Sequence, residues 1–161
     1  MRTHHLTTLF GLVLLAATSV PLAVDAQQER VRFINPPTLS APRGYSHVAE
    51  VPAGSAMLFI AGQVPLDAAG DVVGAHDFRA QAVQVFENLR RALAAGGATF
   101  DDVVKLNYYL LDASQIGIVR EVRDKYVNTK TPPASTLVEV RRLFRDDVSL
   151  EVEAVAVVRR R

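Results

Sequence analysis

The sequence contains no cysteine in its 161 residues. Thiol chemistry and disulfide cross-links are therefore excluded, and the fold must be stabilised by packing. A large excess of charge of either sign is also missing, because 18 lysine and arginine residues balance 17 aspartate and glutamate residues and leave a formal net charge of +1. Such a balance provides no general attraction to nucleic acid or to anionic lipid. We expect no nucleic acid among the partners of this chain.

Motifs that mark common catalytic centres are absent as well. The chain contains no G-x-S-x-G nucleophile motif, no glycine-rich phosphate loop and no C-x-x-C pair. Internal repeats and low-complexity tracts are not visible either. Beyond residue 26 the histidines are His47 and His76, and neither has neighbours at metal-ligand spacing. We therefore predict no metal site and no cofactor.

The first 26 residues have the pattern of a secretory signal peptide. Arg2 belongs to a weakly basic start, and the run Leu6–Leu22 is almost free of charge. Val24–Ala26 then places small or medium residues where a signal peptidase cuts. The alternative is an uncleaved membrane anchor, but the apolar run is short for the roughly 20 residues of a spanning helix. We predict that residues 1–26 are cleaved, giving a periplasmic or secreted protein with no membrane association.

The remaining residues, 27–161, are long enough for one domain with a real core. Residues 27–42 are polar and proline-bearing, which predicts an extended lead-in, and residues 43–161 form the predicted domain. Apolar patterning on both sides of a turn at residues 52–55 predicts a hairpin of Ser46–Val51 with Met57–Ala61. Three later strands are expected at Val103–Leu111, Ser135–Val140 and Ser149–Val158.

Two helices are indicated by apolar residues at helical spacing. The first follows Asp77, which can cap it, and ends at Gly96-Gly97. The second extends from about Ser114 to Asn128 and is followed by Pro132-Pro133. The resulting order β-β-α-β-α-β-β predicts an α+β fold, in which a single mixed sheet carries two helices packed on one face.

The last predicted strand is partly apolar on both faces. One face is apolar from Leu150 to Val158, whereas the opposite face carries Glu151, Glu153, Val155 and Val157. A sheet with one solvated face would alternate more cleanly, and exposed apolar patches of this size are uncommon in monomers. We predict that another copy of the chain covers the second face.

Three segments together carry the pattern of a known family. The first is Gly62–Pro65, with the sequence GQVP. The second is Asp102–Asp112, with the sequence DVVKLNYYLLD, and the third is the run Thr131–Val158. The chain resembles the Rid/YjgF family of reactive-intermediate deaminases, also described as the endoribonuclease L-PSP family, from about Pro42 to Val158. The resemblance implies a chorismate mutase-like fold and a homotrimer whose sheets face a central axis. It also implies a cleft between subunits for a small-molecule ligand, a metabolite.

The resemblance also implies the reaction and the residues that carry it. Family members hydrolyse enamine or imine intermediates to carbonyl compounds and ammonia. Glu153 matches the family glutamate that places the water or passes a proton, so it is the catalytic candidate, although it could be a solvated or interface-paired carboxylate instead. The substrate-binding candidates are Tyr45, Gly62, Arg120, Ser135 and Thr136.

Several of these positions depart from the family pattern. Arg43-Gly44 stands where the family has Gly-Pro before its tyrosine, Ala61 replaces a serine, and Arg120 replaces an asparagine. Ser135 replaces the arginine that holds the substrate carboxylate by two parallel hydrogen bonds. A serine hydroxyl offers a single neutral donor. We therefore predict that simple 2-iminoacids bind weakly and are hydrolysed slowly.

Arg120 has two interpretations, because it could replace the missing charge in the cleft or face solvent near Glu121 and Asp124. Three functions are compatible with the sequence: a diverged enamine/imine deaminase, a non-catalytic trimer that binds a small metabolite, and an endoribonuclease. The balanced charge and the lack of an aromatic-basic stripe argue against the endoribonuclease. Arg120 beside Glu153 would favour the deaminase, and a cleft without positive charge would favour the binding protein.

Overall fold

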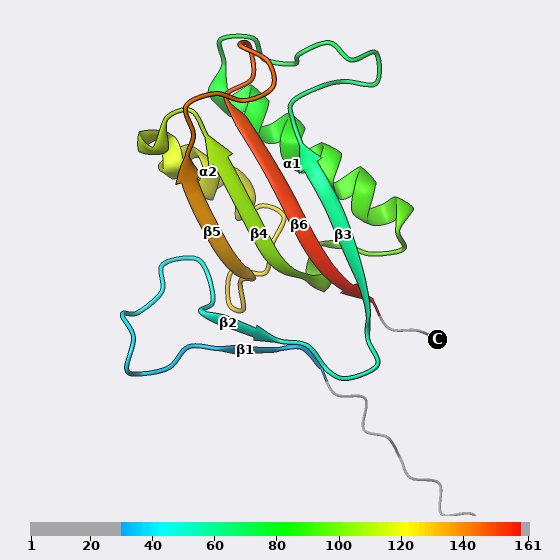
Figure 1. The fold of residues 1–161 in the computed structure, drawn as a ribbon, viewed down its shortest axis with the longest axis vertical. Helices are drawn as coiled ribbons and strands as arrows, with labels where there is room; N and C mark the ends of the chain where they lie inside the picture. Colours follow the sequence, from blue (N-terminus) through cyan, green and yellow to red (C-terminus); the bar gives the residue numbers. More distant parts are fainter. Residues whose placement is uncertain (1–29, 159–161) are drawn as a thin grey trace, which may run out of the picture.

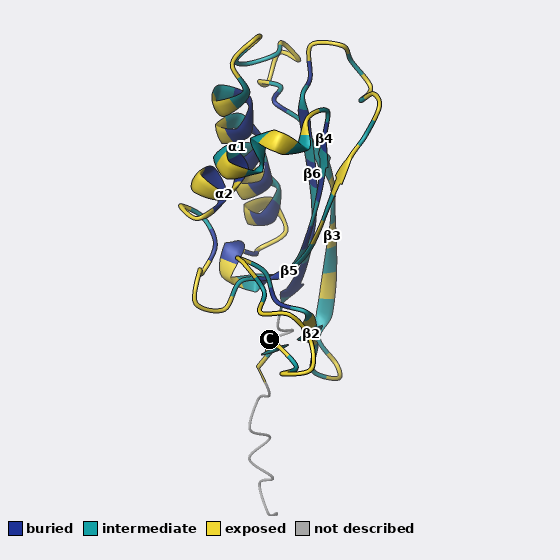
Figure 2. Ribbon diagram, turned by 90° about the vertical axis from the view of Figure 1, so that its left-hand side faces the viewer, coloured by how far each residue is buried: buried dark blue, intermediate teal, exposed yellow. Residues whose placement is uncertain are grey.

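The structure is a computed structural model and describes residues 30–158. A four-stranded sheet forms one layer, and two helices form a second layer on one of its faces (Figure 1, Figure 2). The elements are β3 (Ala56–Gln63), α1 (Phe78–Ala95), β4 (Val103–Leu110), α2 (Ile116–Arg123), β5 (Ala134–Glu139) and β6 (Leu150–Val158). The predicted α+β fold is confirmed. The predicted signal peptide, residues 1–26, lies outside the described residues.

The sheet is mixed, with the strand order β3-β6-β4-β5. Strand β6 is antiparallel to both β3 and β4, and β4 is parallel to β5. The register places Asn107 opposite Glu153 and Leu106 opposite Ser135. Because neighbouring strand residues point to opposite faces, this register fixes which candidate residues share a side of the sheet.

The hairpin predicted from Ser46–Val51 and Met57–Ala61 is wrong. Instead, β2 (Val48–Glu50) pairs antiparallel with β1 (Arg32–Ile34) in a separate two-stranded ladder. An exposed ion pair between Arg32 Nε and Glu50 at 3.1 Å joins the two strands. The alternation of residues 46–51 identified a strand correctly, but alternation does not specify a partner. Its partner is the apolar patch before residue 35, within the segment predicted to be an extended lead-in.

The second helix is shorter than predicted. A 3-10 turn at Ala113–Gln115 precedes α2, which ends at Arg123 rather than near Asn128. Beyond Arg123 the backbone hydrogen bonds include those of a 3-10 turn, which join residues three apart, such as the bond from the Tyr126 N–H to the Arg123 carbonyl at 2.8 Å. The chain between Arg123 and β5 therefore forms turns that bring the helix end close to the start of β5.

The core lies between α1 and the helix-facing side of the sheet. Asp77 caps α1 as predicted, because its Oδ1 accepts a hydrogen bond from the Ala80 N–H at 3.0 Å. One face of α1 and the matching sheet positions are fully buried, as Figure 2 shows by the dark sides that face one another. The central members are Val85, Phe86, Leu89, Leu93, Leu106, Leu110, Leu150 and Val152.

The opposite face of the sheet, which we call the open face, has no helix over it within residues 30–158 (Figure 2). It carries the polar residues Lys105, Asn107, Tyr109, Glu151 and Glu153, and next to them apolar side chains of β3 and β6. Phe59 is 78% exposed and Met57 is 46% exposed. Such exposure is unusual for a sheet face. That a second copy of the chain covers this face stays a prediction, and the open face is the surface that it would cover. No helix in the described part of the chain is long and apolar enough to cross a membrane.

Candidate functional site

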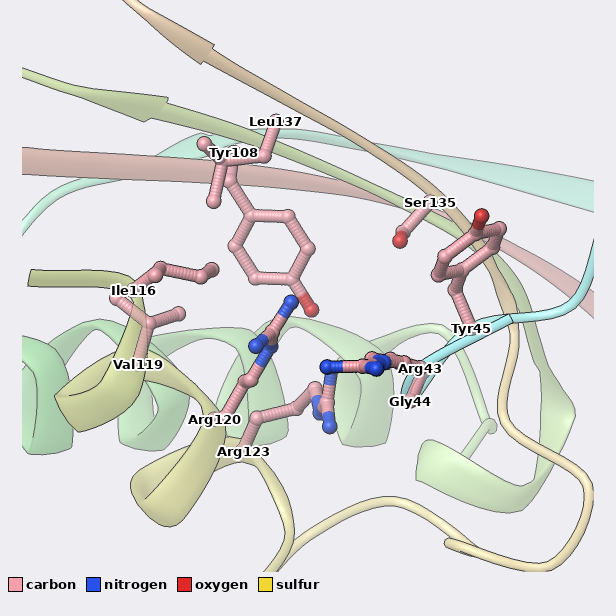
Figure 3. Close-up of a pocket in the computed structure, with 10 residues that line it drawn as sticks. All are labelled: Arg43, Gly44, Tyr45, Tyr108, Ile116, Val119, Arg120, Arg123, Ser135 and Leu137. Atoms are coloured by element: carbon pink, nitrogen blue, oxygen red, sulfur yellow. The ribbon is translucent and has the colours of Figure 1, made fainter. Parts of the chain in front are cut away.

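A small pocket lies between α2, β5 and the loop that precedes Ser46. Its volume is about 210 Å³, below the roughly 300–1,000 Å³ of pockets for drug-sized ligands. The guanidinium groups of three arginines gather on one side, with the Tyr108 hydroxyl pointing toward them and Ser135 across the pocket (Figure 3). The lining residues are Arg43, Gly44, Tyr45, Tyr108, Ile116, Val119, Arg120, Arg123, Ser135 and Leu137.

Strand alternation decides which residues of β5 reach this pocket. Ser135 and Leu137 point to the helix side, where Leu137 also packs against the core. Thr136 points to the open face, where the Lys105 Nζ donates a hydrogen bond to its hydroxyl at 2.7 Å. Of the two neighbouring residues predicted as ligand contacts, the structure places Ser135 in the pocket and Thr136 outside it.

Helix α2 contributes two arginines that are one turn apart. Arg120 and Arg123 have i, i+3 spacing, so both side chains reach the same side of the helix. Ile116 and Val119 on the same helix form the apolar part of the wall. Arg120 has features of both interpretations, because its side chain lines the pocket that contains Ser135 while the residue stays exposed to solvent.

Arg123 holds the loop that carries Tyr45. The arginine is 7% exposed, and its Nη1 donates to the Gly44 carbonyl at 2.8 Å. Its charge is paired with Asp124, with 2.6 Å between Nη2 and Oδ1. The next residue of the loop, Ser46, is fixed to the start of β5 by two bonds, from its N–H to the Pro133 carbonyl and from its hydroxyl to the Pro132 carbonyl. These contacts place Tyr45 beside Ser135.

Gly44 is required at this position for two reasons. Its φ of +77° lies in the left-handed region, and a Cβ there would lie 2.6 Å from the Arg123 Nη2. Gly44→Ala is therefore expected to lower the free energy of unfolding by about 2 kcal/mol, of which roughly half is backbone strain. Gly54→Ala is the matched control, because Gly54 has the same φ and no atom within 4 Å of its Cβ position. Urea unfolding at one protein concentration measures both, and equal losses would show that the Arg123 contact is unimportant.

The pocket carries more positive charge than the chain neutralises. No acidic side chain is among the described residues that line it. Arg123 is paired with Asp124, but neither Arg43 nor Arg120 has an ion-pair partner among residues 30–158. Cations that converge without counter-charges repel one another, and the repulsion is relieved when an anion enters. The pocket is therefore suited to an anionic ligand.

The Tyr108 hydroxyl is a buried donor without a partner. The residue is 3% exposed, and its hydroxyl has no partner at hydrogen-bonding geometry among the described residues. The Arg123 guanidinium lies near it but can only donate, so the hydroxyl proton has no acceptor. Burial raises the pKa of this hydroxyl well above its ordinary value, although the Arg123 guanidinium acts against the shift. The hydroxyl is therefore neutral at ordinary pH and offers its proton to the pocket. A buried polar group left unpaired is unfavourable by about 1–3 kcal/mol, which is a reason to expect a ligand acceptor here.

Glu153 lies on the open face and not in this pocket. Its Oε1 accepts hydrogen bonds from the Asn107 Nδ2 at 2.7 Å and from the Tyr109 hydroxyl at 3.0 Å. The bond to Glu153 raises the pKa of Tyr109, so the phenol keeps its proton and stays a donor. Gly62 belongs to the same face, because a Cβ at this residue would lie 2.7 Å from the carboxyl carbon of Glu151. Gly62 therefore leaves room for a second carboxylate.

The six predicted site residues thus form two groups within one chain. Tyr45, Arg120 and Ser135 line the pocket on the helix side. The other group, Gly62, Thr136 and Glu153, lies on the open face, and the sheet separates the two. No cluster of three or more His, Cys, Asp or Glu side chains that could hold a metal ion occurs in the described part of the chain.

Sequence reasoning missed the residues that support each group. In the pocket these are Arg43, Tyr108 and Arg123, and on the open face they are Asn107 and Tyr109. One signal for the tyrosines was available, because two neighbouring tyrosines in a strand must point to opposite faces. Arg123 could have been found from its i, i+3 spacing to Arg120.

Comparisons with known proteins give the family. A family model described as endoribonuclease L-PSP matches residues 37–158. A crystal structure of the Rid-family protein YyfB from Yersinia pestis matches with a TM-score of 0.70 and 33% identity, and the match covers 80% of this chain and 98% of that one. The chain belongs to the Rid/YjgF family. The family predicted from the sequence is confirmed.

Two curated relatives match this Rid-family chain over similar lengths. Protein DfrA of Myxococcus xanthus is 41% identical over 113 residues, which are 70% of this chain and 84% of that protein. The 2-iminobutanoate/2-iminopropanoate deaminase of Salmonella typhimurium is 36% identical over 115 residues, which are 70% of this chain and 88% of the deaminase. Some members of the family are therefore named as imine deaminases.

Proposed function

We propose that this Rid-family protein hydrolyses a small anionic enamine or imine to a carbonyl compound and ammonia, in a cleft between subunits of a homotrimer. The observation that carries the proposal is the division of the candidate site between two faces of one sheet. Ser135 lies in a basic pocket on the helix side, and Glu153 lies on the open face. One substrate can contact both only where the open face of one copy meets the pocket of a neighbour. The name of the Salmonella relative supports the reaction class.

The two halves of the cleft have separate tasks in this proposal. The basic pocket binds the anionic end of the substrate and orients its C=N bond. Glu153, held by Asn107 and Tyr109, takes a proton from water as the water oxygen bonds to the imine carbon, the π electrons of the C=N bond move to nitrogen, and Glu153 passes the proton on to that nitrogen. In the resulting carbinolamine the hydroxyl proton passes to the amino nitrogen as the C–N bond breaks, which releases ammonia and leaves the carbonyl product.

A second candidate is a trimer that binds a metabolite without turning it over. Ser135 in place of the family arginine favours it, and so does the pairing of the Glu153 Oε1 with two donors of its own chain. The basic character of the pocket favours the deaminase instead, because an orienting positive charge is still present. We further propose, from residues 1–26, that the chain is exported and works in the periplasm or outside the cell.

Ammonia release from a freshly generated 2-iminoacid with one carboxylate tests this function. The wild type is expected to exceed the uncatalysed rate but to be slower than an arginine-bearing relative. The exchange Ser135→Arg/Arg120→Asn restores the family residue at both positions and keeps the number of guanidinium groups in the pocket constant. It is expected to raise turnover by about tenfold or more, whereas Ser135→Arg alone gains less because four guanidinium groups then repel one another. Ammonia release no faster than the uncatalysed rate, in the wild type and in every variant, would support the binding protein.

A further inference from the structure

The strongest unexplained feature of the molecule is the set of polar groups around the Ser135 pocket: two exposed arginines without an ion-pair partner among residues 30–158, and one buried hydroxyl without a hydrogen bond. Arg43 and Arg120 come from different elements, a loop and a helix, and both direct a guanidinium group to the same space (Figure 3). The Arg123 charge is already paired with Asp124. Two positive charges therefore remain for a ligand, in a cavity of about 210 Å³ that admits only a small molecule.

The Tyr108 hydroxyl gives an independent indication of a ligand. It comes from the floor of the sheet, it is almost completely buried, and it points into the same cavity from the side opposite the helix. Its proton has no acceptor among residues 30–158. One neutral phenol and two guanidinium groups thus line the same cavity. Carboxylate oxygens are complementary to this set, because they accept hydrogen bonds from all three groups.

We infer that the anion-binding groups of this cleft are Arg120, Arg43 and the Tyr108 hydroxyl, and that they select a small dicarboxylate. In this arrangement Ser135 is only a minor contact, and the charge comes from α2 and the loop rather than from β5. The inference rests on the proposed function in taking the pocket as the ligand cleft, and it adds the substrate class: an imino or enamino acid that carries a second carboxylate.

Two unpaired guanidinium groups are the reason for choosing a dianion. Arg43 and Arg120 are both exposed at the edge of the pocket, so a monocarboxylate can pair with one of them and leave the other to water, whereas a dianion can pair with both. Arg120 and Arg43 also project from separate elements, so they can hold two carboxylates that are several atoms apart. Inorganic phosphate is the alternative dianion, and it carries its charge on a single compact group.

Titration calorimetry on the purified protein tests the inference with three probes: 2-oxoglutarate as the dicarboxylate, 2-oxobutyrate as the monocarboxylate, and inorganic phosphate. We expect 2-oxoglutarate to bind about 10- to 100-fold more tightly than 2-oxobutyrate. Arg120→Gln is expected to weaken 2-oxoglutarate binding by a similar factor, and Tyr108→Phe by about tenfold. Higher salt should weaken the binding of the wild type more than that of Arg120→Gln.

Two control variants match these changes elsewhere on the molecule. Arg91→Gln removes the same charge from the exposed side of α1, and Tyr126→Phe removes a hydroxyl that donates to Glu87 at 2.9 Å, away from the pocket. Neither is expected to change 2-oxoglutarate binding. Tyr108→Phe should leave the melting temperature of the free protein unchanged or higher, because it removes an unpaired donor, while Tyr126→Phe should lower it.

The outcomes separate this inference from the proposed function. Equal affinity for 2-oxoglutarate and 2-oxobutyrate, tighter binding of phosphate, no binding of any probe, or equal losses in Arg120→Gln and Arg91→Gln would each overturn the dicarboxylate site. Selective 2-oxoglutarate binding without turnover of any imine would leave the site standing and remove the deaminase. Turnover that Arg120→Gln and Tyr108→Phe do not change would remove the site and leave the deaminase.

Discussion

Replacing Glu153 by glutamine is expected to lower the turnover number for imine hydrolysis by about 10²–10⁴-fold, with little change in KM. The glutamine oxygen can still accept from Asn107 and Tyr109, so the side chain keeps its place on β6. It can no longer take a proton from water. The loss should therefore fall on the chemical step and not on binding or folding.

Glu151→Gln is the control for this change. Glu151 lies on the same strand and the same face, next to Gly62. Glu151→Gln removes one negative charge from this face, as Glu153→Gln does. Its effect on turnover is expected to be less than about tenfold, in contrast to the general acid–base loss at Glu153. Similar losses in the two variants would mean that the open face acts through its overall charge and that Glu153 has no special task.

Phe59→Glu is expected to convert the assembled protein into a folded monomer. The side chain is 78% exposed on the open face in one chain, so a charge there does not disturb the core of that chain. In an assembly that covers the open face, the same charge would be buried without a partner, which is strongly unfavourable. Light scattering should give the mass of one chain, and turnover should fall with the loss of the cleft.

Phe144→Glu is the matched control, because Phe144 is 59% exposed but lies outside the sheet, between β5 and β6. It should leave the mass of the assembly unchanged. Val157, which belongs to the same face in the sequence pattern, is a poorer choice, since it is only 7% exposed within a single chain. A charge at Val157 would unfold the chain itself. A wild-type protein that is already monomeric would contradict the shared cleft.

The sequence predicted the layers of the fold because helical and strand periodicity follow directly from which residues face the core. It could not predict that β2 pairs with β1, since the alternation of residues 46–51 fits any strand edge. It also could not place the end of α2 at Arg123, because the helical pattern continues through Val127 while the backbone bonds change. Partner choice and helix ends depend on tertiary contacts that local patterns do not contain.

The candidate site was predicted as six positions of one cleft, and the alternation of two strands shows what this grouping overlooked. Ser135 and Thr136 are neighbours in β5 and must point to opposite faces. Glu153 lies between Val152 and Ala154, both core residues, so it must face away from the helices. The family resemblance gave the positions, and periodicity placed Glu153 on the face opposite the helices. The same periodicity could have separated Ser135 from Thr136.

The unpaired state of Tyr108 could not be predicted. A buried tyrosine usually finds a partner for its hydroxyl, and nothing in the sequence indicates that Tyr108 has none. The convergence of Arg43 with Arg120 was equally hidden, because the two residues are far apart in the chain and meet where the bonds of Arg123 and Ser46 hold the loop.

The central claim is that each cleft joins Glu153 of one copy to the basic pocket of another, and mixing two inactive variants tests it most directly. Glu153→Gln and Arg120→Gln are each expected to be nearly inactive as pure assemblies. In assemblies formed by co-expression of equal amounts, about one quarter of the clefts combine an intact Glu153 with an intact Arg120 from different copies. Ammonia release should then recover to about one quarter of the wild-type rate. Activity no higher than the average of the two pure variants would contradict the shared cleft.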